Sequence, residues 1–366
     1  MPRARHLGTD RIVRTDASTG TTLIQVTSGP LFAESLHMHY EVRTVVADGE
    51  WIIFVSRRYG LEHRTLLAAR SDGSDIVQLS GDGAVSGIVP SPDGRAVYYM
   101  EDGALHRTTI PDADDEVVGR LELPGATAHR AYRGMISWNG HYYFSEISRD
   151  GGEGVVRWDV LSGEAVEVAS CDSTGHPKAN PGGPEVSFTM RKFLPGFDEK
   201  GKRNADKRTV YLHAETLEEL DITFPRGPYG TAHSYWLGTT GKFQGTQQWP
   251  GRGVLVMERG AAEPTVIASP GPYLWHSGAS YDGEWIIADT NFPYEGIWLM
   301  NVATRRSALL CRPPIPAGAV DVGAPHPHPN LSDDGRLAAF TFIVDGVAQV
   351  FVVPVPPGLR EELAPP

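Results

Sequence analysis

The chain has 366 residues, a formal net charge of −12 and an apolar fraction of 40%. The negative charge argues against a nucleic-acid partner, because affinity for phosphate backbones comes mostly from Lys and Arg. Two cysteines, Cys171 and Cys311, are too few for a disulfide framework or a cysteine-based zinc site. No stretch approaches the roughly 20 apolar residues of a membrane span, so no membrane partner is expected.

The two ends of the chain are predicted to lie outside the folded core. The opening segment MPRARHLGTDR has no apolar run behind its basic residues, so no signal peptide is predicted and the cytoplasm is the expected location. Residues 1–18 and the tail 358–366 are expected to be disordered or loosely attached. A single domain is predicted over residues 19–357, with a two-domain organisation as the alternative.

A turn followed by an apolar β run recurs along the whole chain, and 41 Gly and 28 Pro leave little room for long helices. Asp-Gly and Asn-Gly suit tight hairpin turns, because Gly tolerates positive φ. The turns are anchored at Asp48, Asp93, Asn139, Gly183, Thr240, Asp282 and Asp334, with spacings of 42–57 residues. A period of roughly 40–50 residues is typical of propeller blades, so we predict an all-β, seven-bladed β-propeller with four-stranded antiparallel blades.

Two segments complete this prediction. The widest spacing leaves room for an insertion at residues 192–207, KFLPGFDEKGKRNADK, which is charged and is predicted to be an exposed loop. Ring closure in a propeller usually needs one blade shared between the two ends. The segment GTTLIQVTS (residues 20–28) is therefore predicted to complete the blade that ends in QVFVVPV (residues 349–355).

Seven of the thirteen histidines share one position relative to these turns. The innermost strand of a blade precedes the first hairpin turn, so its start lies beside the central channel. Radial repetition would therefore gather residues of this register around one axis. The histidines six to eleven residues before an anchor are His37, His39, His176, His233, His276, His326 and His328.

The segment His326-Pro327-His328 adds a geometric argument. Residues i and i+2 of an extended strand point to the same face, so two imidazoles placed in this way can bind one ion, with His276 as a third ligand. Imidazole suits several divalent transition metals. The alternative is that histidines lining the channel merely form hydrogen bonds with one another and with water.

The same residues carry a resemblance to a known family. The HPHP segment with its Ser-Asp-Asp-Gly turn resembles the metal motif of the oligogalacturonate lyases, which are seven-bladed propellers that bind manganese. Further matches are CDSTGHPKANPGGPEVSFTM, DKRTVYLH, AHSYW and YLWHSGASYDGEW, and the resemblance spans roughly residues 25–355. It implies a divalent metal, most simply Mn²⁺, and a small acidic carbohydrate substrate.

The resemblance also implies roles for individual residues. Three histidines and a glutamine hold the metal in that family, a separate histidine removes the C5 proton, and an arginine assists. By position, the metal histidines match His276, His326 and His328, the base matches His233, and the arginine matches Arg208. Gly323 stands where the family has its glutamine, so water, another side chain such as the nearby Asp321, a different metal or a different substrate must account for this departure.

The expected reaction is β-elimination from short uronic-acid oligosaccharides. A metal-bound carboxylate makes the adjacent proton more acidic, and a neutral His is a suitable base near pH 7. Tyr235 is expected to stack on the sugar, since strand alternation gives it the same direction as His233. The other predicted substrate contacts are His37, His39 and His176.

Two alternatives remain open from the sequence. An epimerase or isomerase would use the same metal and base but return the proton instead of expelling a leaving group. A non-catalytic propeller would serve as a binding platform, since fold alone does not establish function. No G-x-S-x-G elbow, Walker A loop or Rossmann glycine pattern occurs. The oligomeric state is not predicted.

Overall fold

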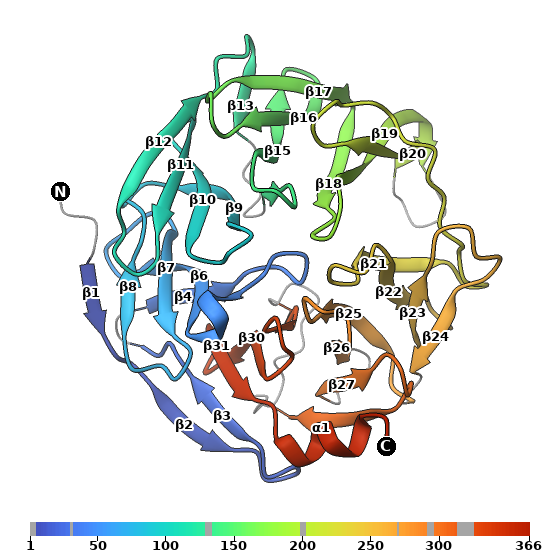
Figure 1. Ribbon diagram of the computed structural model, residues 1–366. Coiled ribbons are helices and arrows are strands. Elements are labelled where there is room, and N and C mark those ends of the chain that lie inside the picture. The colour runs from blue at the N-terminus through green and yellow to red at the C-terminus, as the bar shows by residue number, and fades with distance from the viewer. Residues whose placement is uncertain are drawn as a thin grey trace.

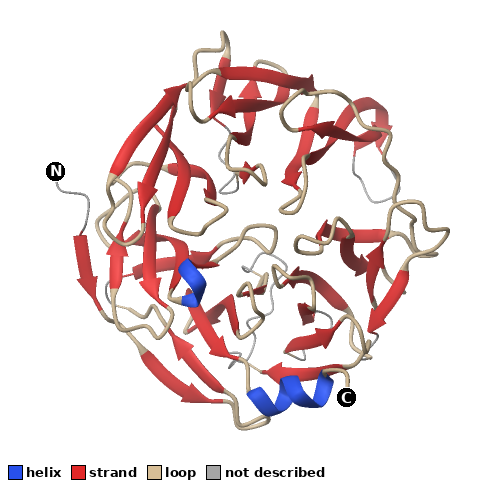
Figure 2. Ribbon diagram, in the orientation of Figure 1, coloured by secondary structure: helices blue, strands red, loops and turns tan. Residues whose placement is uncertain are grey.

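The computed structural model describes residues 5–29, 32–128, 134–197, 203–268, 271–290, 296–312 and 326–366. These residues form seven antiparallel sheets of three to six strands, which stand as blades around a central axis (Figure 1). Strands dominate and the helices are short (Figure 2). The predicted all-β, seven-bladed propeller is confirmed, although the number of strands varies between blades.

The first three blades follow one another along the chain, apart from the edge strand β1. Blade 1 contains β4 (Phe32–His37), β5 (Val45–Val46), the short 3-10 turn η1 (Ala47–Gly49), β6 (Trp51–Arg58), β7 (Thr65–Arg70), β8 (Ile76–Gln78) and, at its outer edge, β1 (Arg5–Gly8). Blade 2 contains β9 (Val85–Pro90), β10 (Ala96–Glu101), β11 (Ala104–Thr109) and β12 (Asp115–Arg120). Blade 3 contains β13 (Ala126–Ala128), β14 (Met135–Ile136), β15 (Tyr142–Arg149), β16 (Gly152–Asp159) and β17 (Ala165–Cys171).

The remaining four blades complete the ring. Blade 4 contains β18 (Ser173–Ala179), β19 (Glu185–Phe197) and β20 (Arg203–His213). Blade 5 contains β21 (Thr231–Trp236), β22 (Phe243–Gln247), β23 (Val254–Met257) and β24 (Thr265–Ala268). Blade 6 contains β25 (Leu274–Ala279), β26 (Trp285–Thr290), β27 (Ile297–Asn301) and β28 (Ser307–Cys311). Blade 7 contains β29 (Asn330–Leu331), β30 (Leu337–Val344), β31 (Val347–Pro354), β3 (Thr22–Gln25) and β2 (Ile12–Thr15).

Every predicted turn anchor lies in the connection between an inner strand and the next strand of its blade. Four of these turns share one hydrogen-bond pattern. A serine hydroxyl donates to the Asp or Asn two residues later at 2.5–2.8 Å, as at Ser91, Ser137, Ser280 and Ser332. The local side-chain bond stabilises the turn independently of the blade, which explains why the turn motif repeats in the sequence.

Blade 7 closes the ring with strands from both ends of the chain. Ile24 and Gln25 of β3 pair with Val352 and Phe351 of β31, as predicted from the sequence. The hydroxyl of Thr21 also donates to the main chain of blade 6, at the carbonyl oxygen of Leu310, 2.8 Å away. The N-terminal hairpin therefore joins two neighbouring blades.

The two ends are more ordered than the sequence suggested. Residues 5–15 contain β1 and β2, exposed strands that pair with β8 and β3. The tail contains helix α1 (Pro357–Leu363), and Leu363 is buried against the core of blades 6 and 7. Expectation and structure differ because backbone pairing with an existing sheet edge requires few apolar side chains, and a single buried leucine attaches the helix.

The segment at residues 192–207, which was expected to be an exposed loop, also differs from the sequence prediction. Strand β19 continues to Phe197 and β20 begins again at Arg203, and the two strands pair beyond the body of blade 4. Residues 198–202 lie outside the described residues, and the charged composition of the described part reflects its exposure in a two-stranded ribbon. None of the helices among the described residues is long and apolar enough to cross a bilayer.

Candidate functional site

An open cavity of about 480 Å³ lies where the inner strands converge on the central axis. Six of the seven histidines of the common register line it, and His37 is the exception. Its described lining consists of His39, Tyr40, Glu41, His176, Lys178, His233, Ser234, Trp275, His276, His326 and His328. Blades 4 to 7 and the segment that follows β4 in blade 1 therefore contribute to one site.

Three inner strands share a local irregularity where they reach the cavity. Their pairing with the second strand of the blade is interrupted by an irregularity, and each irregularity contains one cavity histidine. These histidines are His176 on β18, His233 on β21 and His276 on β25. An irregularity of this kind bends the strand and redirects a side chain, which otherwise would follow strict alternation.

Two cavity histidines also have a left-handed backbone. The φ angle is +49° at His233 and +46° at His328. Positive φ is uncommon outside glycine, and His is one of the residue types enriched there. His328 precedes β29, so the His326-Pro327-His328 segment is not the extended strand that the sequence predicted. Its two rings are nevertheless close to each other, with centroids 5.8 Å apart.

The three predicted metal ligands converge. The ring centroid of His276 lies 4.1 Å from that of His328 and 5.3 Å from that of His326. The indole of Trp275 stacks on His326 at 4.8 Å, which fixes the plane of that imidazole. Burial lowers the pKa of His326, and burial together with the surrounding imidazoles holds the pKa of His328 well below its usual value. These two imidazoles are therefore neutral near pH 7, the protonation state that a metal ligand needs.

Asp289 on β26 fixes the orientation of His276. Its Oδ2 lies 3.0 Å from Nδ1 of His276, and its Oδ1 accepts the backbone N–H of His276 at 2.7 Å. Both side chains are buried. A carboxylate on one imidazole nitrogen leaves the other as the donor to an ion, which is the usual outer-shell arrangement of metal-bound histidine.

His37 has a structural place instead of the predicted substrate contact. Its backbone N–H donates to the hydroxyl of Thr341 at 3.0 Å, and this hydroxyl lies 2.7 Å from Nδ1. Nε2 lies 2.7 Å from the carbonyl oxygen of His328, to which it donates. Burial lowers the pKa of His37 to about 4. The neutral ring of His37 thus stabilises the main chain at His328 by a hydrogen bond and does not line the cavity.

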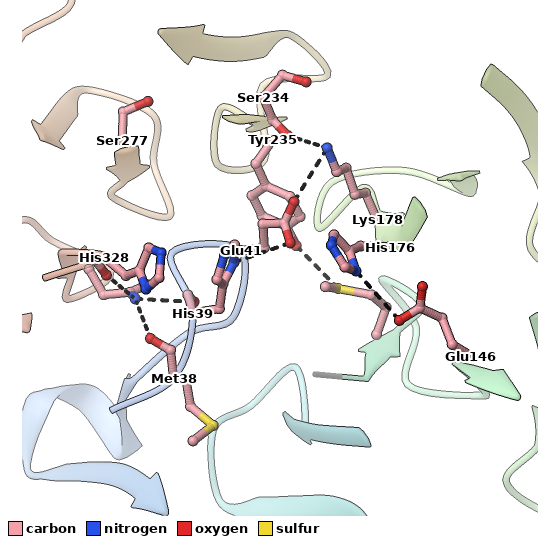
Figure 3. Close-up of polar contacts among 12 residues, drawn as sticks. Met38, His39, Glu41, Glu146, His176, Lys178, Ser234, Tyr235, Ser277 and His328 are labelled. Atoms are coloured by element: carbon pink, nitrogen blue, oxygen red, sulfur yellow. Dashed lines mark hydrogen bonds and ion pairs between the residues drawn. The ribbon is translucent and has the colours of Figure 1, made fainter. Parts of the chain in front are cut away.

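Glu41 links two side chains of the cavity (Figure 3). Its Oε2 lies 3.2 Å from Nδ1 of His39, and its Oε1 lies 3.3 Å from Nζ of Lys178. Lys178 also donates to the carbonyl oxygen of Ser234 at 2.5 Å. The buried carboxylate therefore holds an imidazole and an ammonium group at the cavity wall.

His233, the predicted base, lies beside His276 in the cavity. Its ring centroid lies 4.4 Å from that of His276 and 6.1 Å from that of Tyr40. Burial, together with the neighbouring His276, lowers the pKa of His233 to about 3. His233 is therefore neutral at physiological pH. On the opposite wall, Nδ1 of His176 lies 3.4 Å from Oε2 of Glu146.

Besides His37, two predicted site residues lie away from the cavity lining. The side chain of Arg208 on β20 is 63% exposed and forms an ion pair with Glu219. Tyr235 is half-buried and lines a different pocket, with its hydroxyl near the sulfur of Met135 and the carbonyl oxygen of Ala179. The irregularity at His233 reverses the alternation on which the Tyr235 prediction relied. Asp321 and Gly323 lie outside the described residues.

The ring separations of the three predicted ligands are close to those of imidazoles around one divalent ion. A nitrogen about 2.1 Å from an ion puts the ring centroid about 3.2 Å from it, so two rings would be about 4.5 Å apart in cis and about 6.4 Å apart in trans. The separations among His276, His326 and His328 are 4.1–5.8 Å. Among the described residues, no group of three or more His, Cys, Asp or Glu side chains is arranged to hold an ion as it stands.

Known structures share this architecture. An oligogalacturonate lyase in complex with manganese has a TM-score of 0.77 and 16% identity, over 98% of this chain and 100% of that chain. An oligogalacturonate lyase from Vibrio parahaemolyticus has a TM-score of 0.75 and 14% identity over the same shares. The fold is that of the oligogalacturonate lyases. No protein-family model matches the sequence, and neither does any curated protein.

The oligogalacturonate lyase resemblance seen in the sequence is thus confirmed for the fold. The propeller architecture itself extends to proteins of other kinds. A chain of a mitotic checkpoint complex has a TM-score of 0.52 and 13% identity, over 89% of this chain and 96% of that chain. The shared fold alone therefore does not distinguish this chain from propellers of other kinds.

Proposed function

We propose that this protein is a metal-dependent lyase that cleaves short uronic-acid oligosaccharides by β-elimination. The observation that supports this proposal is the meeting of His276, His326 and His328 beside a neutral His233 in one open cavity. Three imidazoles without a fourth protein ligand would leave coordination positions for substrate. A nearby neutral base is what proton abstraction next to a carboxylate needs.

The metal would be held by His276, His326 and His328. Mn²⁺ is the proposed ion, on the resemblance to the manganese-binding family. When bound, a divalent cation draws charge onto the substrate carboxylate and makes the adjacent C5 proton more acidic. Asp289 keeps His276 in the required tautomer, and the stacked Trp275 keeps His326 in plane.

His233 is proposed to remove the C5 proton. Its lowered pKa keeps the ring unprotonated, so it is ready to accept a proton at any pH above about 4. An entering uronate brings negative charge next to the ring, and negative charge raises the pKa of an imidazole. Substrate binding therefore strengthens the base at the moment it is needed.

The cation that contacts the substrate is assigned to Lys178. This ammonium group lines the cavity and its side chain is 20% exposed, so a carboxylate or hydroxyl of the sugar can reach it. The resemblance gives this supporting role to Arg208, which is ion-paired with Glu219 on blade 4. His39 and His176 complete the polar wall for the sugar.

The deciding experiment follows the unsaturated product. Digalacturonate is incubated with the protein and Mn²⁺, and the ultraviolet absorbance of the conjugated double bond is recorded. Elimination gives a rising absorbance that chelator abolishes and that His233→Gln strongly slows. Release of monosaccharide without absorbance, or no release from any uronate oligosaccharide, would contradict the proposal.

The same experiment tests the epimerase. Return of the proton to C5 exchanges solvent deuterium into the sugar without creating a double bond. Epimerisation would be favoured if mass spectrometry shows deuterium in the uncleaved disaccharide while the ultraviolet absorbance stays constant. A protein that binds the sugar with neither change would be a binding platform.

A further inference from the structure

A row of aromatic rings leads from the surface of the propeller to the histidine cavity. Trp249 lies in the connection between β22 and β23 of blade 5, and its ring centroid is 5.9 Å from that of Tyr273, which directly precedes β25 of blade 6. The ring of Tyr273 lies 6.4 Å from that of Trp275, which lines the cavity and stacks on His326. Trp249, Tyr273 and Trp275 are called the aromatic row below.

Local structure places these three rings side by side. Tyr273 and Trp275 are two residues apart at the start of β25, where alternate side chains point to the same face. Trp249 lies in a tight turn, in which the backbone N–H of Gly251 donates to the carbonyl oxygen of Gln248 at 2.8 Å. The aromatic row therefore joins the ends of two neighbouring blades, which stand next to each other in the ring (Figure 1).

Trp249 differs from the other aromatic side chains at the surface. The residue is 63% exposed, although it has the largest of all side chains. Among the described residues, the exposed rings of Tyr59, Phe197 and Tyr229 have no ring contact with another aromatic side chain, whereas Trp249 is connected to the cavity through Tyr273. Single apolar residues at a surface need no explanation, but a contiguous apolar surface that runs into a cavity is typical of a ligand-binding groove.

A cation accompanies the exposed indole. The guanidinium of Arg252 lies 5.5 Å from the ring centroid of Trp249, and its Nη1 donates to the carbonyl oxygen of Gly271 at 2.7 Å. No carboxylate of the described residues forms an ion pair with Arg252. A guanidinium has five N–H donors, so the remaining donors can bind an anionic ligand. An apolar ring face beside a cation matches a uronic acid, which has C–H groups on its ring and a carboxylate beside them.

We infer that the aromatic row and Arg252 form a binding subsite for the sugar units of an acidic oligosaccharide that extend beyond the cavity. The inference rests on the proposed function and goes further by placing the remainder of a longer substrate. The negative face of an aromatic ring attracts the polarised C–H groups of a sugar, and Arg252 binds the carboxylate. Because the aromatic row is continuous with the cavity, one chain of sugar units occupies both, and uronic-acid oligosaccharides of three or more units bind better than the disaccharide.

Binding of sugars of different length tests the aromatic row. Affinities for di-, tri- and tetragalacturonate are measured by isothermal titration in the presence of Mn²⁺, in a His233→Gln background that makes cleavage slow. The longer sugars should bind about three- to tenfold more tightly than digalacturonate, and Trp249→Ala should remove this gain without changing the affinity for digalacturonate. Tyr59→Ala, which removes a similarly exposed ring next to β6, is the matched control and should keep the gain.

A second variant separates the ring from the charge. Arg252→Gln should weaken binding of trigalacturonate by about two- to fivefold, the range of an exposed ion pair, and should not affect binding of its uncharged methyl ester. Trp249→Ala should weaken binding of both sugars, and Trp249→Phe, which keeps a ring, should retain part of the gain. Equal melting temperatures of the variants show that the propeller is folded in each.

The outcomes separate this inference from the function on which it rests. Equal affinities for tri- and digalacturonate, or an unchanged gain in Trp249→Ala, would overturn the subsite and leave the proposed function intact. If no galacturonate binds to the protein, both are overturned. A changed oligomeric state of Trp249→Ala in analytical ultracentrifugation, with unchanged sugar affinities, would instead make the aromatic row a contact between protein chains.

Discussion

Asp289 holds His276 by both the side chain and the backbone, with an Nδ1–Oδ2 distance of 3.0 Å and an N–Oδ1 distance of 2.7 Å. Its Oδ2 also accepts the backbone N–H of His328 at 3.3 Å. One buried carboxylate therefore aligns two proposed ligands that lie in different blades. Asp289 lies behind the imidazoles and does not line the cavity. It therefore contributes by fixing the position of the two histidines and the tautomer of His276.

Asp289→Asn should weaken metal binding by about 10–100-fold, the range found for outer-shell partners of metal-bound histidine. An asparagine amide that donates to Nδ1 forces the ring proton onto Nε2, the nitrogen needed by the ion. Isothermal titration with Mn²⁺ measures the effect. Asp345→Asn, at an exposed turn of blade 7, is the control. Equal affinities for the two variants would show that Asp289 has no such role.

His233→Gln should slow elimination strongly while leaving metal affinity unchanged. The side chain lies beside His276 but is assigned to the proton, so its loss affects the chemical step. General-base catalysis contributes typically about 10²–10⁴-fold, and kcat should fall by this factor with little change in KM. A tenfold loss of Mn²⁺ affinity in this variant would instead make His233 a ligand.

Lys178→Met and Arg208→Met should differ in steady-state kinetics. Lys178 lines the cavity, whereas Arg208 pairs with Glu219 on the exposed part of β20. We expect Lys178→Met to raise KM for digalacturonate by about tenfold or more, since hydrogen bonds to charged groups contribute about 1.5–3 kcal/mol. A larger effect of Arg208→Met would restore the role that the family resemblance gives to Arg208.

Acid should destabilise the metal-free protein in part through His37. Its pKa is about 4 in the folded chain and 6.5 in the ordinary case, so between these values the unfolded state binds more protons. The stability that the neutral ring provides is complete above pH 6.5 and is lost as the pH falls towards 4, with a loss of about 1.4 kcal/mol per pH unit at most.

Chemical denaturation between pH 7.5 and 4.5 in the presence of chelator measures this slope. His37→Gln should make it shallower, because the replaced side chain no longer titrates, while His233, His326 and His328 still contribute. The exposed His63 provides the control, and His63→Gln should keep the wild-type slope. An unaltered slope in His37→Gln would assign the acid sensitivity to other groups.

Removal of residues 1–28 should destabilise the ring far more than removal of residues 1–9. The longer deletion removes β3 with the buried side chains Leu23 and Val26, each of which contributes about 1.5–3 kcal/mol by burial. The shorter deletion removes only the exposed edge strand β1. Melting temperatures of the two truncated proteins check the order, and similar values would show that blade 7 does not need its N-terminal strand.

The sequence predicted the features that depend on local repetition. Turn motifs at spacings of 42–57 residues predicted the number of blades, and the distance of each histidine from its turn predicted six of the cavity histidines. The closing strand was also foreseeable, because residues 20–28 form an apolar β run outside the seven repeats. None of these steps required knowledge of contacts between blades.

Features set by contacts between blades were missed or misjudged. His37 is buried because Thr341 and His328 of blade 7 lie against it. Tyr235 points away because the irregularity in β21 breaks the two-residue alternation. Asp289 had one available signal, a carboxylate inside the apolar run WIIADT, whereas nothing in the sequence distinguished Glu41 or Lys178.

The irregular inner strands have a consequence for how such a centre can evolve. Each of His176, His233 and His276 is positioned by the kink of its own strand, so no two of them share a local backbone constraint. A substitution at one of these positions therefore leaves the strand irregularities that position the other two histidines unchanged. The side chains that line the cavity can therefore change by single substitutions while the propeller around them stays the same.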